Sequence, residues 1–293
     1  MRRIIKKTDI PFIKYSKTAI AIALVIIAIG LISLIFRGLN FGIDFTGGTL
    51  IQVKFEQPRT IEDIRNDLAT INLENSIIQK SGENEYIIRV PQDLSSANLV
   101  DVIKSTLGIS DQNILRQEQV GPKIGKELQG AALLAIFFSL IVMGIYIAIR
   151  FKFQYSIGVI LSLLHDVLIT LTVFTIFQLE VSLSTIAAFL TIIGYSLNDT
   201  IVVFDRVREN LKLHRNETYE RIMDISINET LSRTIITDMT TFFAVLCLLL
   251  VPGEVRIFAI AMTIGSIAGT YSTIYIAGPL VVFWSRRFKR STK

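Results

Sequence analysis

The chain is poor in the residue types on which most enzymes and small disulfide-rich folds depend. Its 293 residues include one cysteine, two histidines, one tryptophan and six prolines. The single cysteine, Cys247, excludes an intrachain disulfide and a cysteine-ligated metal site. No Walker-type phosphate loop is present, so we do not expect the chain to hydrolyse nucleotides. Charge is also scarce, since only 19% of residues are charged, against about a quarter in soluble domains.

Hydrophobic residues make up 51% of the chain and are concentrated in long runs. Disorder is excluded because so much apolar surface must be buried. A helix needs about 20 apolar residues to cross the hydrocarbon core of a bilayer. The first run is too long for the apolar part of a signal peptide, so it is retained as a membrane helix. We therefore predict six transmembrane helices, at residues 18–36, 130–149, 155–178, 181–204, 234–251 and 257–285.

Lysine and arginine are distributed unequally among the segments that join these helices. Residues 1–17, 205–232 and 286–293 hold six, five and five of them, whereas the links 178–180 and 252–256 hold none and one. Cytoplasmic segments carry the excess of basic residues. We therefore place both termini, 1–17 and 286–293, and the loop 205–233 in the cytoplasm, with residues 37–129 on the opposite side. Basic residues beside anionic lipid account for the net charge of +5 without nucleic acid as a partner.

Residues 37–129 have the pattern of a compact domain of mixed secondary structure. Alternating apolar residues predict a strand at 50–55, and apolar residues at helical spacing predict a helix over 61–71. Further strands are expected near 77–78, 86–90 and 114–120, with a second helix around 99–107. The resulting order, βαββαβ, is that of a ferredoxin-like α+β domain. We expect a binding or lever domain, because it contains no histidine or cysteine and no cluster of acids with a catalytic pattern.

Two glycine-containing segments, 41–49 and 120–125, join this domain to the membrane helices. Turn chemistry alone would explain them, because glycine allows positive φ and proline fixes φ. The functional alternative is a hinge on which the domain pivots against the first and second spans. The candidate hinge residues are Gly42, Asp44, Gly47, Gly48, Gly121 and Pro122.

Asp199 is an acid inside the fourth predicted span, roughly 8 Å from its cytoplasmic end at about 1.5 Å per residue. An unpaired charge at that depth is costly, so this acid must be protonated, paired or in contact with water. Tyr195 lies one turn before it, and Asn198 beside it can hydrogen-bond to a neighbouring helix. Arg233 opens the fifth span at the same level, because the two helices are antiparallel, and its long side chain can reach toward Asp199.

Three more polar residues lie inside the predicted spans, namely Asp238 at nearly the depth of Asp199, and His165 and Asp166 near mid-membrane. A static ion-pair cluster that locks helices together is one interpretation. A proton path is the other, and it is favoured because a single pairing would suffice for locking. Moving an arginine beside a buried acid would switch the proton affinity of that acid. We expect no catalytic residue, no cofactor and no metal ligand.

Several short motifs of this chain occur in the same order in a known family. They are Phe41 to Thr49 (FGIDFTGGT), Val120 to Gly125 (VGPKIG), His165-Asp166, Ile193 to Asn210 (IGYSLNDTIVVFDRVREN), Arg233-Thr234 and Gly269 to Ile274 (GTYSTI). Together they resemble the SecF family, the smaller membrane subunits of the bacterial SecDF accessory complex of the Sec protein translocase. The likeness runs from the first predicted span to the last.

The resemblance implies six helices that form half of an RND-superfamily transporter fold in the bacterial inner (cytoplasmic) membrane, with SecD supplying the other half. It also implies SecYEG, YajC and unfolded preproteins as partners, with the proton-motive force driving late steps of export. In the family, the proton-relay pair falls on the positions that are Asp199 and Arg233 here. The family commonly has serine at the position of Asp238, so this acid is either a relay residue or a local substitution.

Two other functions fit parts of the pattern. A half-transporter for small solutes, from the same superfamily, would require a solute-sized pocket in the outer domain. An intramembrane aspartyl protease would require Asp166 and Asp199 to share a proton as close carboxylates. The predicted depths of these two acids differ, which disfavours the protease.

Overall fold

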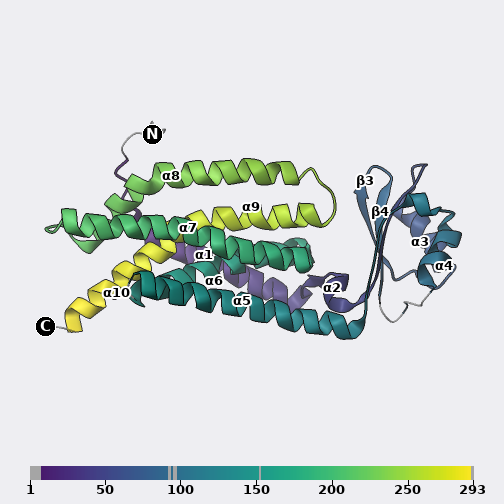
Figure 1. Cartoon of the computed structure of the whole chain (residues 1–293), viewed down its shortest axis with the longest axis horizontal. Coiled ribbons are helices and arrows are strands. Elements are labelled where there is room, and N and C mark those ends of the chain that lie inside the picture. Colours follow the sequence, from purple (N-terminus) through teal and green to yellow (C-terminus); the bar gives the residue numbers. More distant parts are fainter. Residues whose placement is uncertain (1–7, 92–93, 95–97, 152, 292–293) are drawn as a thin grey trace.

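The structure is a computed structural model that describes residues 8–91, 94, 98–151 and 153–291. Residues 1–7, the basic start of the predicted cytoplasmic N-terminus, lie outside the described residues. A bundle of long helices carries a small α+β domain at one end (Figure 1). The start of α1 and the end of α10 lie at the opposite end of this bundle.

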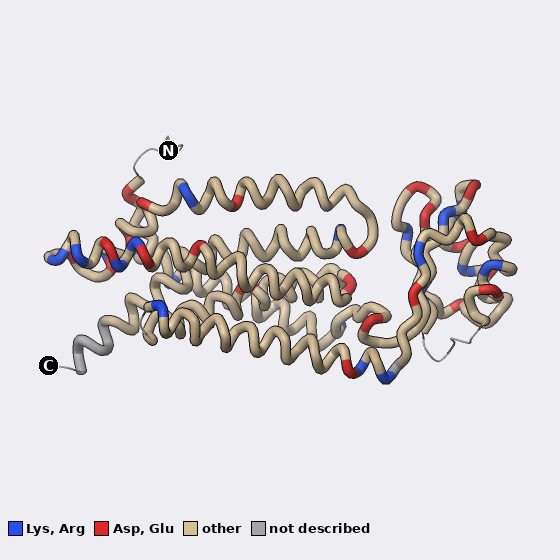
Figure 2. The backbone as a smooth tube through the Cα atoms, in the orientation of Figure 1, with Lys and Arg blue, Asp and Glu red and all other residues tan. Residues whose placement is uncertain are grey.

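Within the described part of the chain, six helices are long and apolar enough to cross a membrane. The bundle contains α1 (Phe12–Arg37), α5 (Pro122–Arg150), α6 (Phe153–Phe177), α7 (Leu183–Leu213), α8 (Tyr219–Leu248) and α9 (Glu254–Ser272), the last continuing through a π-helical turn (Thr273–Ala277) into α10 (Gly278–Ser291). Charged residues are dense in the outer domain and at the far end of the bundle, and sparse along its middle (Figure 2). This distribution is the one that a lipid environment requires.

The helices extend beyond the apolar runs that identify them. The segment 205–233, predicted as a cytoplasmic loop, is mostly helical, because α7 continues to Leu213 and α8 begins at Tyr219. The Thr218 side chain caps α8 by accepting a hydrogen bond from the Arg221 backbone N–H at 3.3 Å. An Arg206–Glu229 ion pair of 2.6 Å joins the two extensions. The end of an apolar run therefore marks where a helix leaves the membrane, and the helix itself continues beyond that point.

The outer domain has an antiparallel sheet of four strands in the order β3-β4-β2-β5. Along the chain, its elements are β2 (Gly48–Lys54), α3 (Ile61–Ala69), β3 (Ile77–Gly82), β4 (Glu85–Pro91), α4 (Leu99–Leu107), a 3-10 turn (Asp111–Asn113) and β5 (Ile114–Val120). Ile51, Ile88 and Ile103 are fully buried where the helices cover the sheet. This order and these elements agree with the strands and helices predicted from the apolar periodicity.

A short parallel strand pairing joins the segment that leads into the outer domain to the link between two helices of the bundle. β1 (Asn40–Phe41), which follows α1, pairs with β6 (Glu180–Val181), which lies between α6 and α7. The one-turn helix α2 (Ile43–Thr46) follows β1 and packs on α5. The outer domain is therefore attached to the bundle through the link between α6 and α7 as well as through its covalent connections to α1 and α5.

Candidate functional site

Two carboxyl groups from neighbouring helices meet inside the bundle. Asp199, near the middle of α7, is only 4% exposed, and it interacts with the Asp238 carboxyl of α8 and with the charge of Arg233. Asp238 accepts a hydrogen bond of 3.0 Å from the Tyr195 hydroxyl and another from Thr270 Oγ1 of α9. The fold thus brings together four residues singled out in the sequence and adds Thr270 to them.

The chemistry of this cluster follows from its two acids. A carboxyl group can bind or release a proton, and the fold places two of them, Asp199 and Asp238, next to each other. Arg233 is exposed on the surface of α8, where its long side chain is free to change its distance from Asp199. An arginine in that position favours the ionised form of the Asp199 carboxyl when it is near, and this effect is lost when it is distant.

Asp166 belongs to a second cluster on another face of α7. Its carboxylate is fully buried and accepts hydrogen bonds from Ser196 Oγ at 2.7 Å and from Ser272 Oγ at 3.0 Å. His165 Nδ1 lies 3.0 Å from the other oxygen of the same carboxylate, and the His165 ring stacks on Tyr271. These contacts join α6, α7 and α9, so Asp166 links three helices at the same depth in the bundle.

The His165 side chain has an unused polar atom in that second cluster. Nε2 of His165 is buried and finds no hydrogen-bond partner among the described residues. A ring nitrogen of this kind can carry or pass on a proton. His165 and Asp166 therefore stay candidates for a proton path, separate from the cluster of Asp199 and Asp238. The two acids that an aspartyl protease would need to place together lie in different clusters.

A polar stripe on the bundle surface is not covered by this chain. Thr191, Gly194 and Asn198 are exposed at helical spacing on α7, and Arg233 is exposed on α8. Polar side chains in membrane helices face other helices or water, since hydrocarbon cannot satisfy them. Small residues such as glycine allow close helix contact in membranes. Asn198 therefore lies on a face suited to a second polypeptide and not inside the acidic cluster.

The segment 41–49, predicted as a hinge, is packed against the link between α6 and α7. Asp44 Oδ2 accepts a hydrogen bond of 2.8 Å from the Leu183 backbone N–H at the start of α7. A Cβ on Gly42 would lie 2.5 Å from a carboxylate oxygen of Glu180. Gly47 and Gly48 adopt positive φ angles of 74° and 133°, which favour glycine. The local structure therefore favours glycine at three of these positions, Gly42, Gly47 and Gly48.

The second predicted hinge segment begins a helix. Gly121 is the N-cap of α5, with an extended φ of −73°, and Pro122 is the first helical residue. A Cβ on Gly121 would meet nothing within 4 Å, so packing does not require glycine at this position. Proline suits the first position of a helix because an N–H group there would have no partner within the helix. The hinge role of these residues stays a prediction.

Sequence reasoning missed the hydroxyl groups that hold the acids. Thr270 and Ser272 both lie in the motif Gly269 to Ile274, and they face different clusters, one on Asp238 and one on Asp166. Their presence in an otherwise apolar span was the available signal. Which acid each hydroxyl would meet depends on how the helices are rotated in the bundle. Among the described residues, no group of three or more His, Cys, Asp or Glu could hold a metal ion.

Profiles of two related families match most of the chain. The family described as protein export membrane protein SecD/SecF, C-terminal, matches residues 101–287. The SecD/SecF GG motif matches residues 32–58, which include Gly47 and Gly48. The two matches cover the end of α1, the positive-φ glycines and the helices that carry both acidic clusters.

Curated relatives are similar over nearly their whole length. The chain is 43% identical to the protein translocase subunit SecF of Desulfurispirillum indicum over 95% of this chain and 93% of that one. It is 43% identical to the protein translocase subunit SecF of Vibrio alginolyticus, over 93% of this chain and 89% of that one.

Solved structures of SecDF share the fold. The crystal structure of SecDF from Thermus thermophilus, a translocon-associated membrane protein, has a TM-score of 0.87 and 36% identity, covering 96% of this chain and 39% of that one. A crystal structure of SecDF in a super-membrane-facing form has a TM-score of 0.72 and 35% identity, covering 100% and 40%. This chain therefore spans about two fifths of the solved SecDF chains.

Proposed function

The chain belongs to the SecD/SecF family of protein-export membrane proteins, and from this membership we propose that it is a proton-driven, SecF-type subunit of a protein translocase. It is a multi-pass membrane protein, with six membrane helices among its described residues. The observation that carries the proposal is the buried Asp199, which interacts with the half-buried Asp238 and lies near an exposed arginine. Such a pair can exchange protons only when water or a moving basic group reaches it.

Proton transfer in this proposal takes place at the Asp199 carboxyl. Protonation of Asp199 removes its attraction for Arg233, and deprotonation restores it. Tyr195 and Thr270 donate hydrogen bonds to Asp238, which leaves Asp199 as the member of the pair that changes its charge. A potential of 100 mV supplies about 2.3 kcal/mol per charge moved across the membrane, enough to bias a hinge.

The movement would reach the outer domain through α7. The N-terminus of α7 is bonded to Asp44, next to the strand β2 that opens the outer sheet. A shift of α7 that follows protonation would therefore pull on the base of that sheet. The strand order supports a ferredoxin-like domain, and the motion that we propose is a tilt of this domain on the segments around Gly47 and Gly121 while it holds a translocating chain.

The partner that completes this machine is SecD in our proposal. The exposed stripe of Thr191, Gly194 and Asn198 is the surface on which the second half of an RND-type bundle would dock. The two halves would together serve SecYEG and YajC, and the substrates would be unfolded preproteins. We place the complex in the bacterial inner membrane, with both termini in the cytoplasm and the outer domain outside it.

The test is an export assay with the purified complex and SecYEG in proteoliposomes. Completion of preprotein translocation is measured with and without an imposed proton-motive force. We expect Asp199→Asn to remove the stimulation by the proton-motive force while assembly with SecD is unchanged. Asp205→Asn is the matched control, because Asp205 is a half-exposed acid of the same helix that pairs with Arg150 at 3.1 Å. Full stimulation in Asp199→Asn would contradict the proposal.

A further inference from the structure

A groove of about 710 Å³ lies between three helix segments on the side of the bundle away from the outer domain. It is lined by the start of α1, the start of α8 and the first residues of α10. The start of α1 and the start of α8 lie at the end of the bundle opposite the outer domain (Figure 1). None of the described residues that line the groove belongs to the proposed proton relay, so a ligand bound in it is independent of proton transfer.

The lining of the groove changes from charged to apolar across the predicted membrane boundary. Ile20 and Leu280 lie inside the predicted first and sixth spans, whereas Lys17 and Glu220 precede the spans of their own helices. Apolar surface in such a groove is more stable against hydrocarbon than against water, and a lysine at its edge can keep its charged head in the polar layer. The groove therefore suits a molecule that is apolar at one end and charged at the other.

Charges of both signs line the groove from different helices. Lys14 and Lys17 are exposed about one turn apart on α1, and Glu220 and Asp224 lie about one turn apart on α8. Neither lysine forms an ion pair with an acid in the described part of the chain. Asp224 is only 7% exposed and accepts a hydrogen bond of 2.9 Å from the Ile13 backbone N–H, so it holds the start of α1. Lys17 and Glu220 are the more accessible charges, and they do not pair with each other.

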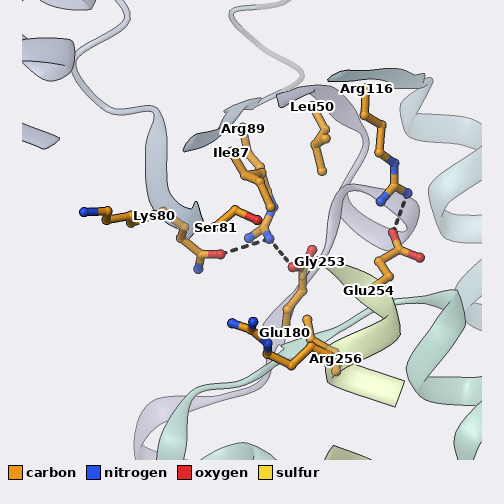
Figure 3. A pocket seen from close by; sticks show the side chains of 12 residues that line it. Leu50, Lys80, Ser81, Ile87, Arg89, Arg116, Glu180, Gly253, Glu254 and Arg256 are labelled. Atoms are coloured by element: carbon orange, nitrogen blue, oxygen red, sulfur yellow. Dashed lines mark hydrogen bonds and ion pairs between the residues drawn. The ribbon is translucent and has the colours of Figure 1, made fainter. Parts of the chain in front are cut away.

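The crevice between the outer domain and the bundle shows the opposite arrangement (Figure 3). There Glu180 pairs with Arg89, and Glu254 pairs with Arg116 at 2.7 Å. Both acids of that crevice are neutralised by direct contact. In the groove of α1, α8 and α10, the lysines and the acids stay apart, which leaves room for a ligand that carries both charges.

We propose that this groove binds a phospholipid with an ethanolamine headgroup. Its phosphate contacts Lys17, its ammonium group contacts Glu220, and one acyl chain lies against the apolar wall of the groove. Hydrogen bonds between charged groups are strong, and a primary ammonium has N–H groups for a carboxylate, whereas choline has none. The acids of α8 disfavour a headgroup that carries only negative charge. Lys14 has a lesser part, because its Nζ lies 5.9 Å from the centre of the neighbouring Tyr15 ring.

The test measures the thermal unfolding temperature of the purified chain in nanodiscs of phosphatidylethanolamine, phosphatidylcholine and phosphatidylglycerol with the same acyl chains. We expect the highest unfolding temperature in phosphatidylethanolamine. Lys17→Gln and Glu220→Gln should each remove this preference, because each removes one of the two charges that the headgroup contacts. Lys17→Gln should not change the unfolding temperature in phosphatidylcholine. Lys126→Gln is the matched control, because Lys126 is an exposed lysine near the start of α5 that does not line the groove.

A second measurement detects the lipid directly. The chain is purified in detergent with radiolabelled phosphatidylethanolamine, and retained lipid is counted after gel filtration. We expect the unmodified chain to bind the lipid about tenfold more tightly than Lys17→Gln, which corresponds to one hydrogen bond between charged groups. Equal unfolding temperatures in the three lipids, or a preference for phosphatidylethanolamine that survives both substitutions, would overturn the proposal. A preference for phosphatidylglycerol that is lost only in Lys17→Gln would also overturn it, in favour of an anionic lipid.

Discussion

A close contact between α1 and α6 offers a sharp test of the helix packing in the bundle. A Cβ added at Gly30 of α1 would lie 2.6 Å from Thr172 Cβ and 2.7 Å from Thr172 Cγ2 on α6. Thr172 is 4% exposed, and its hydroxyl donates to the Leu168 carbonyl at 2.8 Å. A short side chain of this kind cannot rotate out of the way, so Gly30→Ala must push the two helices apart.

The size of the effect follows from contact distances. Carbon atoms in van der Waals contact lie about 3.5–4.0 Å apart, so α1 must move by about 1 Å along the contact. Overpacking of this kind costs about 1–3 kcal/mol. We therefore expect Gly30→Ala to lower the thermal unfolding temperature of the purified chain in detergent.

Gly194→Ala is the matched control on α7. A Cβ at Gly194 would meet nothing within 4 Å, and replacing a mid-helix glycine by alanine stabilises a helix by about 0.5–1 kcal/mol. The two substitutions are chemically identical and should change the unfolding temperature in opposite directions. Unchanged stability in Gly30→Ala would refute the packing of α1 on α6.

Three further outcomes are expected. Gly194→Leu should leave the isolated chain stable but prevent copurification of the second subunit, whereas retained copurification would show that this face is not the docking surface. Ser196→Ala should cost about 1.5–3 kcal/mol of stability, since it removes a hydrogen bond to the buried Asp166 carboxylate, and calorimetry of the purified chain measures it. Burial raises the pKa of Glu180 against the opposing charge of Arg89, so its contribution to stability is present in acid and lost as pH rises through that raised pKa. Glu180→Gln should flatten this part of the profile of unfolding temperature against pH.

The membrane helices could be predicted from composition because the bilayer imposes a minimum apolar length. Their ends could not be predicted in the same way. The extensions of α7 and α8 are polar on their exposed sides and are stabilised by a cap at Thr218 and by the Arg206–Glu229 pair. Both contacts are invisible to a hydropathy pattern.

The acidic cluster was predictable as a group but not in its bonding. Antiparallel neighbours placed Asp199, Asp238 and Arg233 at one level, and the fold brings them together. The donors to the acids come from α9 as well as from α7. They depend on helix rotation, which a single sequence determines only through packing. The contact of Asp44 with Leu183 was equally inaccessible, because 139 residues separate the two in the chain.

Proton flux through the reconstituted complex tests the central claim most directly. Proteoliposomes that contain this chain and its second subunit are loaded with a pH-sensitive dye, and a potassium diffusion potential drives proton entry. The account predicts a flux in the unmodified complex that is absent in Asp199→Asn and retained in Asp205→Asn. An undiminished flux in Asp199→Asn would contradict the claim that the buried carboxyl of α7 carries the proton.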